Sequence, residues 1–165
     1  MRALAQLVVL IGILLPVHAT TLQQLPLAEM ARQSTAIVRA KVYRERASQR
    51  KTGIFTVYRL ETLEQLKAQG PVVREFAVPG GVTGGIQQVV EGAPALRDGA
   101  EYVLFLWTSR SGLTQIIGLS QGVFPIEPRG VKEEMLVRHL ASGERMVDAA
   151  GRPVQDNAYT MPWSQ

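Results

Sequence analysis

Short apolar stretches separated by polar turns make up most of the chain, a pattern typical of a mainly β protein. Residues 36–43 are rich in β-branched positions and partly alternate, and the polar stretch 47–53 separates them from a second apolar stretch at 54–58. We expect these two stretches to pair as a long hairpin. Further strands are predicted at 72–78 and 102–107, and the second of these is apolar on both faces, as in a central core strand.

Turn residues also divide the second half of the chain. The segment 109–112 marks a hairpin turn that leads into a strand within 113–119, and a further strand is predicted at 123–126. Many short strands with turns between them favour a closed or nearly closed β-barrel over an open sheet. A short helix is predicted near 26–33, because proline is tolerated in the first helical turn.

Two stretches fit more than one element. Residues 60–67 place leucines three apart, which suits a helical stripe, but the preceding strand could equally run on. Residues 131–140 fit either a helix or one arm of a final hairpin that turns at Ser142 and Gly143, and we favour the hairpin.

The N-terminus predicts export. Arg2 precedes an apolar run, Ala3–Leu15, and the residues that follow end in Ala19, the pattern of a cleaved signal peptide. The alternative is an uncleaved anchor, but the run is shorter than the roughly 20 residues that span a bilayer. We therefore expect a secreted or periplasmic protein with no stable membrane anchor after cleavage. The predicted organisation is a signal peptide at 1–19, a β-barrel domain at 20–150 and a flexible C-terminal tail at 151–165.

The residue types present limit the chemistry. The chain has no cysteine, which excludes disulfides, thiolate metal sites and cysteine nucleophiles. After cleavage at Ala19, His139 is the one histidine left, with Ser142 three residues away and no nucleophile-elbow pattern around it. A hydrolase using His139 is the least favoured function for this chain, behind the binding module and the inhibitor-like domain discussed below. We predict no catalytic residue, no metal site and no cofactor.

A basic patch is predicted on the first long strand. The formal net charge is +4, and the segment from Arg32 to Lys51 contains seven Lys or Arg residues but one acidic residue. The patch includes Arg39, Lys41, Arg44 and Arg46. It could attract an anionic partner, but a solvated strand face has the same composition, and we favour that interpretation. Export further disfavours nucleic acid as the partner.

The segment after residue 78 is the favoured place for a ligand or partner contact. It is rich in glycine, which lets backbone N–H groups approach a ligand closely. The residues singled out are Gly80, Gly81, Thr83, Gly84 and Gly85. The lysine and hydroxyl ending of a phosphate-binding P-loop is missing, so we favour a mobile or tightly turning barrel loop as the interpretation of the segment itself.

The order of these segments resembles a group of uncharacterised exported bacterial domains over roughly residues 22–150. The resemblance rests on the stretches 78–81, 84–85, 92–94, 101–106 and 118–124, in that order. A fainter resemblance is to the netrin-like domain of tissue inhibitors of metalloproteinases, whose first strand is similar to residues 36–42. That resemblance implies a barrel of the oligonucleotide/oligosaccharide-binding (OB) type.

Function does not transfer with the second resemblance. Those inhibitors chelate the protease zinc through an N-terminal cysteine, whereas the expected mature terminus here is Thr20-Thr21. We therefore expect a mainly β, OB-like or netrin-like barrel with a short N-terminal helix, acting as an exported non-enzymatic binding module for an unknown exported protein or glycan. The alternative is a metalloprotease-inhibitor-like or protease-associated domain.

Overall fold

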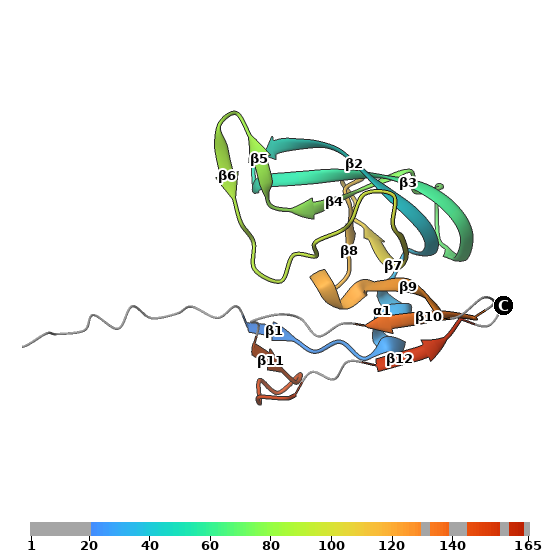
Figure 1. Cartoon of the computed structure of the whole chain (residues 1–165). Helices are drawn as coiled ribbons and strands as arrows, with labels where there is room; N and C mark the ends of the chain where they lie inside the picture. Colours follow the sequence, from blue (N-terminus) through green and yellow to red (C-terminus); the bar gives the residue numbers. More distant parts are fainter. Residues whose placement is uncertain (1–20, 130–132, 139–144, 156–158, 164–165) are drawn as a thin grey trace, which may run out of the picture.

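The computed structural model describes residues 21–129, 133–138, 145–155 and 159–163, and the chain in these ranges is mainly β (Figure 1). The largest sheet has eight strands in the order β12-β10-β9-β7-β2-β3-β4-β8. Its members are β2 (Ala36–Arg50), β3 (Gly53–Ala68), β4 (Glu75–Pro79), β7 (Glu101–Thr108), β8 (Thr114–Ile116), β9 (Val123–Arg129), β10 (Glu133–Arg138) and β12 (Tyr159–Pro162). No helix in the described ranges has the length and apolar character of a membrane span.

Smaller elements flank this sheet. The strands β1 (Thr21–Gln23) and β11 (Arg145–Val147) pair in parallel, and β5 (Gly81–Thr83) and β6 (Ile86–Gln88) form a hairpin. The seven-residue helix α1 (Leu27–Gln33) precedes β2, and the short 3₁₀ helix η1 (Leu119–Gly122) joins β8 to β9.

Five strands close on themselves in a ring of pairings. The strand β2 pairs with β3 and β7, β3 pairs with β4, and β7 pairs with β8, all antiparallel. The ring closes through a parallel contact between β4 and β8 at the single pair Ala77 and Gln115. The predicted long hairpin is confirmed as β2–β3, and β7 is the central strand predicted from its apolar sequence, since it pairs with β2, β8 and β9.

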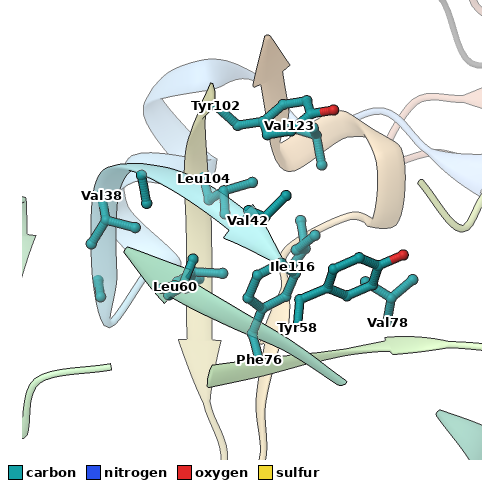
Figure 2. Packing of buried hydrophobic residues seen from close by; sticks show 13 residues of the cluster. Val38, Val42, Tyr58, Leu60, Phe76, Val78, Tyr102, Leu104, Ile116 and Val123 are labelled. Carbon is teal, nitrogen blue, oxygen red and sulfur yellow. The ribbon is translucent and has the colours of Figure 1, made fainter. Parts of the chain in front are cut away.

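Two cores lie on the two faces of β2 and β7. Figure 2 shows the first, in which side chains from the ring strands point toward one another, with Tyr58 stacked on Phe76 at a ring separation of 5.5 Å. The second core joins α1, β9 and β10 to the opposite face through Met30, Phe124 and Leu136. Burial of each large side chain contributes about 1.5–3 kcal/mol, so both cores stabilise the fold.

Residues 60–67 are a strand interrupted by β-bulges. The register shifts three times along the β2–β3 pair, and Leu63 and Leu66 are the extra residues at two of these points. A bulge places one added residue in a strand, so two bulges three residues apart produce a spacing that resembles a helical stripe. This accounts for the ambiguity of the leucine pattern, and both side chains are exposed.

The C-terminal segments differ from expectation. Residues 133–138 form β10, a strand as favoured, but β10 pairs with β9 and β12, and the proposed turn at 142–143 lies outside the described residues. The expected tail at 151–165 contributes β12 to the eight-stranded sheet. Met161 and Trp163 pack against the second core, which gives this end of the chain an apolar anchor.

Candidate ligand-binding groove

The glycine-rich segment and one residue of the predicted basic patch line the same groove. The groove has a volume of about 350 Å³. Gly80, Gly81 and Arg44 all contribute to it, although Arg44 lies on β2, far away in the sequence. The remaining lining residues come from the ring strands, the β5–β6 hairpin and the following loop: Thr56, Tyr58, Val78, Pro79, Val82, Gln87, Gln88, Val89, Val90, Ala93, Pro94, Ala95 and Leu96. We call it the hairpin groove.

Gly81 lets the hairpin start directly on the surface of β2–β3. Its φ is +140°, and a Cβ added there would lie 2.5 Å from the Thr56 hydroxyl oxygen and 3.3 Å from the Ala47 Cβ. The Thr56 hydroxyl donates a 2.8 Å hydrogen bond to the Gly80 carbonyl, and the Gly80 N–H donates to the Ile54 carbonyl at 2.8 Å. Close backbone approach therefore requires glycine at position 81.

The hairpin is tied to the ring by a side chain and exposes apolar residues. The Ile54 N–H donates a 2.9 Å hydrogen bond to the Gln88 amide oxygen. Val82, Ile86 and Val89 are 58%, 55% and 76% exposed. Single exposed apolar residues are common, but two within one short hairpin and a third directly after it, beside a groove, form a surface suited to contact with a partner.

Gly84 and Gly85 have a structural role. They connect β5 to β6 with φ angles of +56° and +75°, the conformation that a two-residue hairpin turn of this type requires. A Cβ added at either position would meet no atom within 4 Å. These two glycines and Thr83, predicted as contact residues, lie in the hairpin outside the groove lining. This part of the segment therefore forms the tight turn between β5 and β6.

Arg44 and Tyr58 give the groove its polar end. Burial raises the pKa of the Tyr58 phenol above its usual value, and the nearby positive charge of Arg44 opposes that shift. The backbone N–H of Arg44 donates a 2.6 Å hydrogen bond to the Asp98 carboxylate, which positions the backbone at this point. The arrangement places one exposed guanidinium in a groove that is lined by both apolar and polar residues.

Arg39, the first member of the predicted basic patch, is largely covered by β10 and the C-terminal segment. Its side chain is 11% exposed, forms ion pairs with Glu101 and Glu134, and lies 5.5 Å from the Trp163 ring centre. Burial opposes its charge, but the hydrogen bonds from Arg39 to Glu134 and Glu101 outweigh burial and raise the pKa of the guanidinium. Arg39 therefore cannot serve a surface patch, because β10 and the C-terminal segment cover it.

The other two predicted basic residues lie among acidic neighbours. Arg46 forms ion pairs with Glu45 at 2.9 Å and Glu75 at 3.2 Å. Lys41 is opposite Glu61 on one neighbouring strand and opposite Glu101 on the other. Opposite charges at directly paired strand positions favour sheet pairing, so the strand face is balanced in charge. Of the four named residues of the patch, Arg44 lines the hairpin groove.

A second groove lies beside the seam between β4 and β8. It has a volume of about 210 Å³ and is lined by Arg50, Glu75, Ser111 and Thr114 among others. This seam groove is smaller and more polar than the hairpin groove, and none of the predicted contact residues lines it.

Sequence reasoning missed the groove residues other than Gly80, Gly81 and Arg44. The valines at 82 and 89 flank the Gly84–Gly85 pair, and apolar residues on both sides of a Gly-Gly pair are a signal of a hairpin. Gln88 could not have been found, because its bond to Ile54 joins residues 34 positions apart. Among the described residues, no three His, Cys, Asp or Glu side chains form a group that could hold a metal ion. His139 and Ser142 lie outside the described residues.

Comparison with known proteins does not assign the chain to a family. No protein-family model, curated protein or solved structure matches the chain.

Proposed function

We propose that this protein is an exported, non-enzymatic binding module that holds a protein partner in the hairpin groove. The observation that carries the proposal is the convergence of Gly80, Gly81 and Arg44 on one groove beside exposed valines. The mature chain contains a single histidine and no cysteine, which leaves few of the residues that enzymes use as bases and nucleophiles.

The ring of five strands supports a barrel of the OB type. An OB-fold is a five-stranded, partly open barrel. The order β2-β3-β4-β8-β7, with its antiparallel pairs and a minimal parallel contact between β4 and β8, is compatible with such a barrel. On this scaffold the β5–β6 hairpin is part of the connection between β4 and β7. Loops on a rigid barrel commonly provide recognition.

The groove chemistry favours a protein segment as the ligand. Val82, Val89 and Val90 offer apolar contact, and Gln87 and Gln88 offer amide hydrogen bonds. Arg44 can pair with a carboxylate, because guanidinium groups form charge-assisted hydrogen bonds to carboxylate oxygens. A partner that presents apolar side chains beside an Asp or Glu satisfies all three kinds of contact.

Affinity capture with matched variants tests this proposal. The mature chain, residues 20–165, would be used as bait for the envelope fraction and medium of the producing cells. The bait would be compared with the double variant Val82→Ser/Val89→Ser and with the control Val72→Ser, which changes a valine that is 67% exposed outside the groove. We expect a saturable protein partner that the control retains and the double variant loses.

The outcome also separates the possible partners. An exported metalloprotease slowed by the bait would identify the inhibitor-like form of this function. Equal capture by all three baits would contradict the hairpin groove as the binding site. Turnover of a substrate by the pure protein, abolished by His139→Ala, would contradict the non-enzymatic proposal.

A further inference from the structure

Trp107 extends the outward face of β7 beyond the layer that covers the rest of that face. Val103 and Phe105 lie on the same face of the strand, are 2% and 6% exposed, and belong to the second core. Trp107 is next in this alternation and is 44% exposed. An exposed indole at the end of a buried stripe leaves a large flat aromatic surface open to a ligand.

The groove beside Trp107 combines this aromatic surface with neutral polar groups. It has a volume of about 410 Å³ and is lined by Gln33, Trp107, Gln115, Ile116, Ile117 and Gly118. Gln115 lies on β8 directly opposite Trp107, and Gln33 comes from the end of α1. Each glutamine amide can both donate and accept hydrogen bonds, and none of the described residues that line this groove is charged.

The orientation of Gln33 is fixed by its neighbours on the helix. Its amide nitrogen donates a hydrogen bond to the Glu29 carboxylate, and Arg32 forms an ion pair with the same carboxylate. The charges of Glu29 and Arg32 therefore balance each other on α1. The amide oxygen of Gln33 remains as a hydrogen-bond acceptor for a ligand in the groove.

We propose that this Trp107 groove binds the ring of a neutral carbohydrate. A sugar ring has an apolar face of C–H groups that can stack on the indole, and its hydroxyl groups match the donors and acceptors of Gln33 and Gln115. A nucleobase could also stack on Trp107, but binding of a nucleic acid strand depends on cationic groups along its phosphates, and the lining residues that the structure describes include no cation. The site is separate from the hairpin groove and does not depend on the function proposed there.

Titration by NMR tests the proposal at the level of the residue. The mature protein would be mixed in turn with four neutral hexasaccharides, namely cello-, chito-, malto- and laminarihexaose, and with two anionic probes, hexagalacturonate and oligo-dT. The indole N–H resonances of Trp107 and Trp163 report the two tryptophans separately. We expect at least one neutral hexasaccharide to shift the Trp107 resonance while that of Trp163 is unchanged.

Variants then distinguish stacking from non-specific contact. We expect Trp107→Ala to weaken the binding of that hexasaccharide at least tenfold, Gln115→Ala to weaken it less, and Trp107→Tyr to retain most of it. The control Leu63→Ala removes another exposed apolar side chain, 47% exposed on β3, and should leave the affinity unchanged. Thermal unfolding would check that each variant is folded.

Three results would overturn the carbohydrate proposal: no shift of the Trp107 resonance with any neutral hexasaccharide, stronger binding of either anionic probe, or equal affinity for the wild type and Trp107→Ala. The variant Val82→Ser/Val89→Ser should bind the hexasaccharide normally. Failure of the carbohydrate proposal can therefore be distinguished from failure of the proposed partner binding in the hairpin groove.

Discussion

The two ends of β2 use arginine in different ways. At the covered end, Arg39 lies beneath β10 and the C-terminal segment, between Glu101 and Glu134. At the open end, Arg46 pairs with exposed carboxylates and Arg44 lines the hairpin groove. The comparison shows that a run of basic residues on one strand does not define a basic surface, because the layer packed on each end decides what each charge can contact.

The largest difference between the two ends should be in stability. We expect Arg39→Met to lower the free energy of unfolding by about 2–3 kcal/mol, because it leaves Glu101 and Glu134 close together without a cation. Arg46→Met should lower it by less than about 1 kcal/mol, since its ion pairs are exposed. Urea unfolding of both variants measures these changes, and equal losses would show that the covered end is not buried as described.

The second largest effect on the free energy of unfolding is expected where the β5–β6 hairpin contacts the five-stranded ring. We expect Gly81→Ala to lower the free energy of unfolding by about 2 kcal/mol or to displace the hairpin, because its Cβ would lie 2.5 Å from the Thr56 hydroxyl oxygen. The matched control is Gly85→Ala, where φ is also positive but space is open, and about 1 kcal/mol is expected.

Calorimetric or urea unfolding compares the two glycine variants. If Gly85→Ala proved as costly as Gly81→Ala, backbone conformation alone would explain both losses and the close approach of the hairpin to β2–β3 would lose its support.

The smallest effect should come from the surface of α1. The hydrogen bond from Arg32 lowers the pKa of Glu29 from 4.5 to about 2. A lowered folded-state pKa means that this carboxylate contributes stability above its unfolded pKa and loses the contribution as pH falls through about 2. The unfolding midpoint of Glu29→Gln should therefore lie slightly below that of the wild type at pH 6 and approach it near pH 2. A constant difference across that range would contradict the assigned pair.

Part of the fold followed from local pattern. The β2–β3 hairpin and the central strand β7 were predictable, because their apolar residues are continuous or alternate and polar turns separate them. The bulges at Leu63 and Leu66 were not, since a bulge changes the spacing of apolar residues without a residue type that marks it. The pairing of β12 with β10 also could not be predicted, because it depends on contacts between segments far apart in the chain.

The candidate groove shows the same limit. Glycine at 80 and 81 was predicted to let the backbone approach a ligand. In the structure Gly81 lies close to β2–β3, and the same composition at 84 and 85 serves a turn. A sequence cannot distinguish these cases, because the difference lies in what faces each glycine. Arg39 and Arg44 were equivalent in sequence for the same reason, and the strands packed over one of them separate their roles.

The most direct test of the account is the affinity of the captured partner for Arg44→Ala and Arg46→Ala. Isothermal titration calorimetry would compare each variant with the wild-type mature chain. We predict at least a tenfold loss of affinity for Arg44→Ala, since it removes the charge at the groove, and less than a threefold loss for Arg46→Ala. Equal losses, or a loss confined to Arg46→Ala, would contradict the claim that the hairpin groove is the binding site.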